Sequence, residues 1–285
     1  MQQSIIEGNW FQLRDGQKMY YLDWRNDSTL PAIVTLHGSL TTCRTWDFMA
    51  QELGEFRVIC PDLRGFGESA AFLDTCSITN MVEDIKELII GLELAPCYLV
   101  GYSMGSRVAG KFCITYPDLI TGLVLVDTSD FAMNDERRGN PAELALRPDV
   151  FKSWEELVNY LKKHEGIRWE ESWIHHHART MTEVNDAGWF SHKVRTKVLV
   201  KMRETINPDF FPFAYKISCP TLIMRGADST IFTREEADFL ARAIERSQLV
   251  EVTGAGHFIM QEQFGAFMQH VRAFLSSVEA NKMLR

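Results

Sequence analysis

The sequence lacks the features that mark membrane proteins and nucleic-acid-binding proteins. No segment reaches the 18 or more consecutive apolar residues of a membrane-spanning helix. The amino terminus has neither the basic stretch nor the continuous apolar core of a signal peptide. Lysine and arginine, 30 together, are outnumbered by 38 acidic residues, and the net charge of -8 opposes binding to a phosphate backbone. We therefore expect a soluble, cytoplasmic protein that binds no nucleic acid and has no membrane span.

Cysteine spacing typical of metal sites is also missing. The six cysteines lie far apart without a CxxC pair, and Cys60, Cys97 and Cys113 stand within apolar runs. This pattern indicates reduced thiols that serve as small hydrophobic side chains. No linker rich in proline, glycine or serine divides the 285 residues, so the length suits two small domains or one large domain with an insertion.

The sequence does contain a regular alternation of strand-like and helix-like segments. Residues 10–14 and 18–24 alternate in polarity around Asp15-Gly16, which predicts a β-hairpin. Apolar strand-like runs follow at 32–36, 56–60, 97–102, 122–127, 221–226 and 248–252. Helical periodicity lies between them near 43–53, 79–93, 104–116, 233–245 and 262–277. This order predicts an α/β fold with a mainly parallel, doubly wound sheet.

The alternation stops for about ninety residues between Asp127 and Pro220, where the sequence is helix-like and aromatic. We therefore expect a core domain built from residues 1–128 and 218–285, and a helical cap inserted at 129–217. Large aromatic side chains in excess of what a small core needs would line an apolar pocket, and packing alone remains an equal alternative. We expect Trp189 and Phe211 to bind substrate.

Residues 101–106, "GYSMGS", place a serine between two glycines at a predicted strand-to-helix turn. Such a turn holds Ser103 in a strained backbone conformation with its hydroxyl exposed, as in a nucleophile elbow. The neighbouring strand and helix leave no room for side chains two residues away, which explains Gly101 and Gly105. The N–H of Met104, at the start of the helix, can stabilise an oxyanion.

A nucleophilic serine needs a base, and the base needs an acid to orient it. His257 follows the last predicted strand and Asp228 follows the strand before it, so both should lie at the edge where Ser103 lies. Asp228 is the preferred acid. Asp127 and Asp130, after the strand at 122–127, are rivals because an acid there can also reach the base.

Five segments together resemble the α/β-hydrolase superfamily: "LHGSLTTCRTW", "PDLRGFGES", "GYSMG", "RGADSTIF" and "GAGHFIM". The resemblance implies a capped serine hydrolase with the catalytic triad Ser103, Asp228 and His257. It also implies an oxyanion hole formed by the backbone N–H groups of Ser39 and Met104. Many members carry a proline where this chain has Leu40. The chemistry requires no cofactor and no metal.

Other conspicuous residues are assigned structural roles. His37 is expected to brace the oxyanion loop, and Arg64 to anchor its own loop. The run His175-His176-His177 cannot converge on one metal ion, because consecutive helical residues point about 100° apart. These three histidines are predicted to lie on a helix surface.

The sequence as a whole favours a hydrolase of a small, mostly apolar ester, thioester or lactone, acting as a monomer or homodimer. Two alternatives stay open. The same residues can serve carbon–carbon bond hydrolysis or cofactor-free lyase and oxygenase chemistry, and the fold also supports ligand receptors that do not catalyse. An intact triad favours catalysis.

Overall fold

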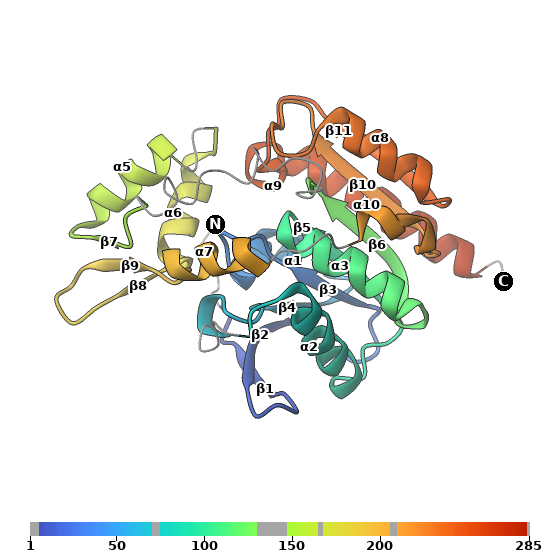
Figure 1. The fold of residues 1–285 in the computed structure, drawn as a ribbon, viewed down its shortest axis with the longest axis horizontal. Coiled ribbons are helices and arrows are strands. Elements are labelled where there is room, and N and C mark those ends of the chain that lie inside the picture. Colours follow the sequence, from blue (N-terminus) through green and yellow to red (C-terminus); the bar gives the residue numbers. More distant parts are fainter. Residues whose placement is uncertain (1–5, 70–74, 130–146, 165–167, 206–209, 284–285) are drawn as a thin grey trace.

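The structure, a computed structural model, describes residues 6–69, 75–129, 147–164, 168–205 and 210–283 (Figure 1). Its centre is an eight-stranded sheet in the order β1-β2-β4-β3-β5-β6-β10-β11. The strands are β1 (Asn9–Gln12), β2 (Lys18–Trp24), β3 (Ala32–Leu36), β4 (Arg57–Pro61), β5 (Cys97–Tyr102), β6 (Ile120–Val126), β10 (Thr221–Gly226) and β11 (Ser247–Val252). β1 and β2 form an antiparallel hairpin, β2 pairs antiparallel with β4, and the other neighbours are parallel. The predicted hairpin and mainly parallel sheet are confirmed.

Alternate side chains of the strands enter two separate hydrophobic layers. Val34 and Leu36 belong to one layer, and Ile33 between them belongs to the other, as the period of two in a strand requires. The first layer is covered by α2 (Ile78–Gly91), α3 (Met104–Thr115) and α8 (Arg234–Ala243). The second is covered by α1 (Asp47–Glu52), α9 (Ile259–Glu262) and α10 (Phe264–Met283). The sheet is therefore doubly wound, as expected.

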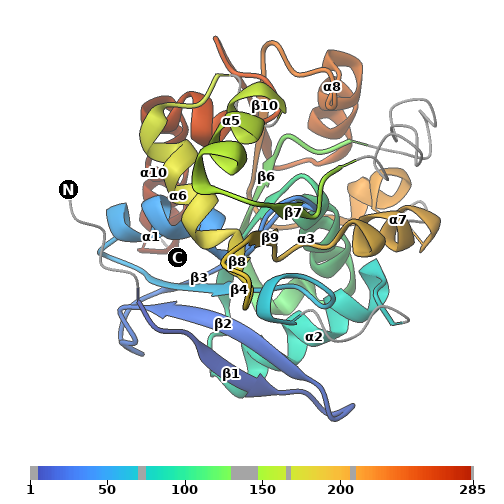
Figure 2. The same ribbon diagram turned by 90° about the vertical axis from the view of Figure 1, so that its left-hand side faces the viewer.

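β6 and β10 are neighbours in the sheet, although residues 129–217, here called the inserted segment, separate them in the chain. Its described elements are β7 (Val150–Phe151), α5 (Trp154–His164), α6 (Glu171–Thr180), β8 (Thr182–Val184), β9 (Phe190–His192), α7 (Thr196–Thr205) and the 3₁₀ helix η5 (Phe211–Lys216). β7, β9 and β8 form a small antiparallel sheet (Figure 2). The sequence predicted helices alone, so this sheet corrects the expectation of a purely helical insertion.

The inserted segment packs on the core through a third hydrophobic cluster. Trp169 and Trp173 belong to this cluster, and Phe48, Phe258 and Phe264 of the core pack against it. In Figure 1, α5, α6 and the small sheet lie on the side of the molecule away from the carboxyl terminus. Within the described ranges, no helix is long and apolar enough to cross a membrane.

Candidate active site

The turn between β5 and α3 has the geometry of a nucleophile elbow. Ser103 has φ 52° and ψ -116°, a conformation that non-glycine residues rarely adopt. A Cβ atom on Gly101 would lie 2.5 Å from the carbonyl oxygen of Gly105, and one on Gly105 would lie 2.1 Å from that of Leu36. Both glycines are therefore required by close backbone packing, as the sequence predicted. The strained turn leaves Ser103 partly exposed at the carboxyl edge of the sheet.

His257 lies in the loop after β11 and contacts this serine. Its Nε2 atom is 3.1 Å from Ser103 Oγ, and its side chain is 20% exposed. The ring packs against Tyr102 at 5.1 Å and Phe258 at 5.5 Å between ring centres. These contacts hold the imidazole beside the serine and leave one side of it open to solvent.

The acid beside His257 is Asp127, which directly follows β6. Its Oδ1 atom lies 2.7 Å from His257 Nδ1, and its side chain is fully buried. Because a carboxylate only accepts hydrogen bonds, Nδ1 carries the proton and donates, which leaves Nε2 free to accept from Ser103. Asp127 itself has φ 41°, which directs the chain sharply out of the strand.

The prediction that Asp228 orients His257 is therefore wrong in this structure. Ala227 and Asp228 lie in a turn closed by the hydrogen bond from Ser229 N–H to the Gly226 carbonyl oxygen, 3.0 Å. This turn places the Asp228 carboxylate in solvent, where its side chain is 49% exposed and lies 2.7 Å from Arg168 Nη1. The rival position, Asp127, takes the inner place, while Asp130 lies outside the described residues.

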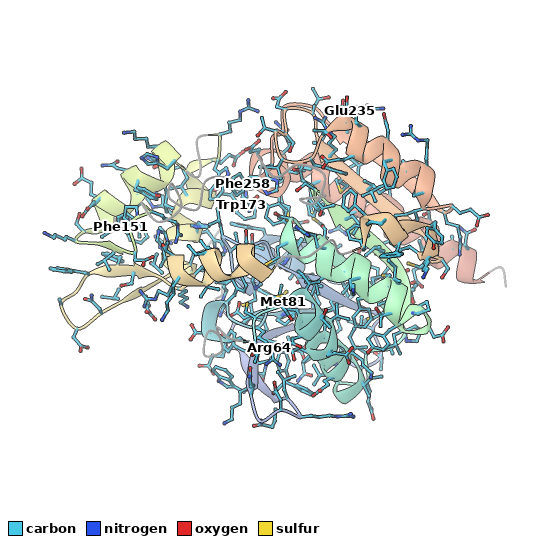
Figure 3. The ribbon with its side chains drawn as sticks, in the orientation of Figure 1. Arg64, Met81, Phe151, Trp173, Glu235 and Phe258 are labelled. Carbon is cyan, nitrogen blue, oxygen red and sulfur yellow. The ribbon has the colours of Figure 1, made fainter. Side chains whose placement is uncertain are left out.

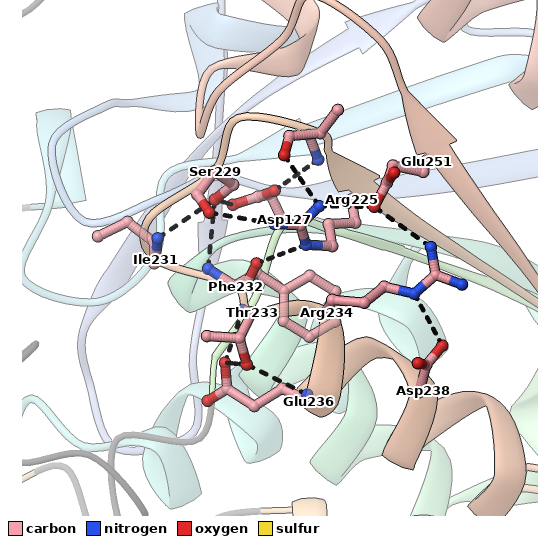
Figure 4. A network of polar contacts seen from close by, with 12 residues as sticks. Asp127, Arg225, Ser229, Ile231, Phe232, Thr233, Arg234, Glu236, Asp238 and Glu251 are labelled. Carbon is pink, nitrogen blue, oxygen red and sulfur yellow. Dashed lines mark hydrogen bonds and ion pairs between the residues drawn. The ribbon is translucent and has the colours of Figure 1, made fainter.

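Two further donors reach the Asp127 carboxylate from the end of β10 and the loop that follows it (Figure 4). The Gly226 N–H donates to Oδ2 at 2.8 Å, and the Ser229 hydroxyl donates to Oδ1 at 2.6 Å. Hydrogen bonds of this kind to a charged group contribute about 1.5–3 kcal/mol each. They offset the cost of burying the carboxylate, and sequence reasoning missed Ser229 because nothing distinguishes its hydroxyl from any other in a loop.

The loop after β3 lies against the elbow. A Cβ atom on Gly38 would lie 2.9 Å from the Tyr102 ring and 3.4 Å from Ser103 Cβ. His37 is buried, donates from Nδ1 to the Gly38 carbonyl oxygen at 2.8 Å and accepts at Nε2 from Leu63 N–H at 3.0 Å. Burial lowers the pKa of His37, so the ring stays neutral and can serve both bonds. The predicted bracing role of His37 agrees with these contacts.

The oxyanion hole is predicted to use the backbone N–H groups of Met104 and Ser39. Met104 is the first residue of α3, so its N–H has no partner within the helix. Ser39 lies in the turn after Gly38 and is half-buried. The Gly38 carbonyl oxygen also accepts from Thr41 N–H and Thr41 Oγ1, both at 3.2 Å. Because the N–H of a trans peptide points opposite to its carbonyl, the Ser39 N–H is turned away from these contacts.

Aromatic side chains of the inserted segment and the core meet beside His257. Trp169 is 7% exposed, and its ring centre lies 5.0 Å from that of Phe258 in an edge-to-face contact. Figure 3 shows Phe258 near Trp173, which belongs to the same cluster. The ion pair between Arg168 and Asp228 joins the inserted segment to the core next to this contact. The site therefore has an apolar wall with a charged outer edge.

The two aromatic residues expected to bind substrate are used differently. Phe211 is 1% exposed and packs on Phe210 and Phe239, which places its ring in the hydrophobic layer of α3 and α8. Trp189 is 40% exposed, follows the turn between β8 and β9, and lies 5.6 Å from Lys152 Nζ. These contacts correct the expectation for both residues, and Trp169 lies at the apolar wall instead.

The histidine run on α6 also differs from its prediction. His176 and His177 are buried, and only His175 is partly exposed, where it pairs with Glu171 at 3.4 Å. The prediction of three surface histidines is therefore wrong for two of them. His176 packs on Phe48 of the core, and His177 packs on Trp169 of the inserted segment. Among the described residues, no group of histidine, cysteine and acidic side chains could hold a metal ion.

His176 meets a buried carboxyl group where the inserted segment contacts the core. Its Nε2 atom contacts the Arg44 carbonyl oxygen at 3.1 Å and lies 3.5 Å from Asp47 Oδ2. Burial raises the pKa of Asp47 to about 7 and lowers that of His176 to about 4. Arg44 opposes the rise at Asp47, since its Nη1 atom lies 3.6 Å from Oδ2. The carboxyl and imidazole are both uncharged between these two values.

Arg64 has the structural role that the sequence predicted. Its Nε atom donates to Asp84 Oδ2 and its Nη1 atom to Asp15 Oδ2, both at 2.7 Å. These bonds tie the loop after β4 to α2 and to the amino-terminal hairpin.

The arrangement of sheet, elbow, histidine and buried acid is that of the alpha/beta hydrolase fold family, to which this chain belongs: the family's sequence profile matches residues 31–263. The sn-1-specific diacylglycerol lipase ABHD11 of Mus musculus is 28% identical over 264 residues, 88% of this chain and 82% of that protein. A putative 2-succinyl-6-hydroxy-2,4-cyclohexadiene-1-carboxylate synthase of Bacillus subtilis is 26% identical over 87% of this chain and 91% of its own length.

A solved structure of similar shape is that of E-2-(acetamidomethylene)succinate hydrolase. It superposes with a TM-score of 0.85 and covers 95% of this chain and 99% of the other. At 19% sequence identity this likeness shows the shared fold. The relatives of this family with lipase names support hydrolase chemistry on the present fold.

Proposed function

We propose that this protein is a serine hydrolase of small, mostly apolar carboxylic esters, thioesters or lactones. The observation that carries the proposal is the continuous contact from Ser103 Oγ to His257 Nε2, and from His257 Nδ1 to Asp127. A serine hydroxyl is a weak nucleophile unless a neighbouring base removes its proton. In this site the base is in hydrogen-bond reach, and a buried carboxylate fixes its tautomer.

The proposed reaction proceeds in two halves. Ser103 Oγ attacks the substrate carbonyl carbon while His257 Nε2 takes the hydroxyl proton, and Asp127 stabilises the imidazolium that forms. The N–H groups of Ser39 and Met104 stabilise the oxyanion. His257 then protonates the leaving alcohol or thiol, which departs and leaves an acyl group on Ser103. Water, deprotonated by His257, attacks this acyl group, and the acid product and the free serine result.

The preference for an apolar substrate is supported by the wall of Trp169 and Phe258, and by the lipase names of relatives. We propose that the inserted segment acts as a cap over the active site, because it supplies Trp169, one of the two aromatic residues of this wall. No metal or organic cofactor takes part in the proposed steps. The six cysteines are free and buried, which agrees with the proposed cytoplasmic location.

A fluorophosphonate probe tests the proposal directly. The wild-type protein should take up one adduct, mapped to Ser103 by peptide mass, and should hydrolyse p-nitrophenyl esters. The Ser103→Ala variant should remain unlabelled and lose turnover by at least about a thousandfold. Labelling at another residue, or full turnover by the variant, would refute a role for Ser103 as nucleophile.

The Bacillus subtilis relative is named as a synthase, which favours a second candidate: carbon–carbon bond hydrolysis or cofactor-free lyase chemistry in which the same residues transfer protons. The two candidate functions differ in whether an acyl group forms on Ser103 during turnover: only the ester hydrolase requires it. Rapid quenching during ester turnover should trap an adduct of the acyl mass, and its absence with a panel of esters, thioesters and lactones would favour the second candidate.

A further inference from the structure

The last residue of β10 and the loop after it each supply one donor to the Asp127 carboxylate. Gly226 N–H donates to Oδ2 at 2.8 Å, while Ser229 Oγ donates to Oδ1 at 2.6 Å. Oδ1 is also the atom that lies 2.7 Å from His257 Nδ1. One carboxylate oxygen, Asp127 Oδ1, therefore accepts from both the Ser229 hydroxyl and the His257 imidazole. A change in the position of the hydroxyl would move this oxygen and so alter its hydrogen bond to the imidazole.

The direction of the Ser229 hydroxyl proton follows from its other contacts. The Oγ atom accepts from the N–H groups of Ile231 at 3.3 Å and Phe232 at 3.2 Å. Since a hydroxyl has one proton and two lone pairs, these two donors leave the proton for Asp127. Ser229 is 6% exposed, so water competes little for this proton.

Arg225 holds the loop in place through hydrogen bonds to its backbone (Figure 4). Its guanidinium donates to the carbonyl oxygens of Phe232 at 2.8 Å, Ala227 at 3.1 Å and Ser229 at 3.3 Å. Its charge is balanced by Glu251 at 2.6 Å. The Ser229 hydroxyl is thus attached to a loop whose backbone is fixed at three points.

We propose that Ser229 is a positioning residue for the hydrolysis proposed above, on which this inference rests. Its hydroxyl holds Asp127 Oδ1 so that the carboxylate keeps His257 directed at Ser103. The torsion that rotates a carboxylate is soft, so without the Ser229 hydroxyl Oδ1 is held by His257 alone and the carboxylate can tilt about its remaining bond to Gly226 N–H. The same donor also stabilises the negative charge, and its loss strengthens the attraction between Asp127 and a protonated His257.

Three variants test this role. Ser229→Ala should lower kcat for a p-nitrophenyl ester by about tenfold with KM little changed, because positioning acts on the chemical step. The pH profile of kcat should also change in this variant, because the hydroxyl donates to the same Asp127 oxygen that His257 contacts. Ser229→Thr keeps the hydroxyl and should restore most of kcat. Thr230→Ala removes an exposed hydroxyl from the same loop and should behave as the wild type.

A proton NMR spectrum separates this proposal from the proposed function, because it needs no substrate. The downfield resonance of the His257 Nδ1 proton should shift or broaden in Ser229→Ala and keep its wild-type position in Ser229→Thr. An unchanged resonance, or wild-type kcat and pH profile in Ser229→Ala, would overturn the positioning role. If the wild type hydrolyses no ester while the resonance moves as expected, the proposed function fails and the contact between Ser229 and the Asp127–His257 pair stands.

Discussion

Asp127 and Asp228 each follow a strand at the same edge of the sheet, and they have opposite environments. Asp127 is fully buried and accepts from His257, Ser229 and the Gly226 backbone. Asp228 is half exposed and pairs with Arg168. A carboxylate that must orient a histidine needs a fixed position and little competition from water, and only Asp127 has both. The local turn therefore decides which acid serves the site, more than the order of residues in the chain.

Replacement of the buried acid should have the largest effect. Asp127→Asn keeps the shape of the side chain but allows the wrong tautomer of His257, a change that costs about four orders of magnitude in a serine protease. We expect kcat for p-nitrophenyl esters to fall by at least about a thousandfold. Normal circular dichroism and thermal unfolding would establish that the variant folds. If Asp127→Asn remains active while Asp228→Asn is inactive, the assignment of the acid is reversed.

Asp47 sharpens the comparison, because it is buried like Asp127 but its Oδ1 atom has no hydrogen-bond partner in the described part of the chain. Its pKa is raised to about 7, so the folded protein holds a proton there that the unfolded chain has released. This stabilisation is present at low pH and is lost as the pH rises toward 7. Between pH 5 and 7.5 the wild type should lose about 2.5 kcal/mol more unfolding free energy than Asp47→Asn, because the loss is about 1.4 kcal/mol per pH unit and levels off above pH 7.

Urea unfolding of both proteins at the two pH values measures this difference. Glu55→Gln is a matched control, because Glu55 is an exposed carboxylate that lies 2.8 Å from Arg272. Parallel losses in the wild type and Asp47→Asn would show that Asp47 is ionised in the folded protein.

The apolar wall gives a smaller effect that depends on the substrate. Trp169→Ala removes the ring beside Phe258, so kcat/KM for long acyl chains should change by about tenfold relative to acetate esters. Fluorophosphonate labelling of Ser103 should persist. Trp189→Ala, which alters an exposed ring on the β8–β9 hairpin, should leave the ratio unchanged. An equal change in both variants would refute Trp169 as a determinant of acyl length.

The exposed acid should give the smallest effect. Asp228→Asn and Arg168→Gln each break an ion pair that is half exposed on both sides, and such pairs contribute about 0–1 kcal/mol. We expect kcat to change less than about threefold in either variant. The double variant should resemble each single one. A loss of more than about tenfold in Asp228→Asn alone would show that this carboxylate acts on the reaction.

The strands were predictable because continuous apolar runs of five or six residues are typical of a parallel sheet covered on both faces. The expected segments 97–102 and 221–226 agree with β5 and β10, whereas β6 begins two residues before the expected segment. The small sheet of the inserted segment was not predictable, because strands of two or three residues have no measurable periodicity. These short strands are recognisable only by their hydrogen-bonded pairing in the folded protein.

The parts of the site that could be predicted are those where the local sequence reflects a constraint on the backbone. The glycines around Ser103 report a close approach of strand and helix, and the loop after β11 brings His257 to that serine. The choice of acid depended on how the turn after Gly226 directs two adjacent side chains, Asp228 outward and Ser229 inward. Aromatic residues were equally ambiguous, since composition cannot distinguish the packed ring of Phe211 from the ring of Trp169 at the wall.

The adjacency of β6 and β10 has a consequence for how this architecture can diversify. Leu123 pairs with Thr221 and Val126 with Met224, so the chain leaves and re-enters the sheet on neighbouring strands about 4.8 Å apart. Because the two strands are parallel, the chain leaves at the carboxyl end of β6 and returns at the amino end of β10. This fixed span imposes little constraint on the length of the excursion, since closure entropy grows only slowly with loop size. Asp127 precedes the excursion, and Ser229 and His257 follow it. The inserted segment, and with it the substrate selectivity, can thus be replaced while the catalytic residues keep their positions on the sheet.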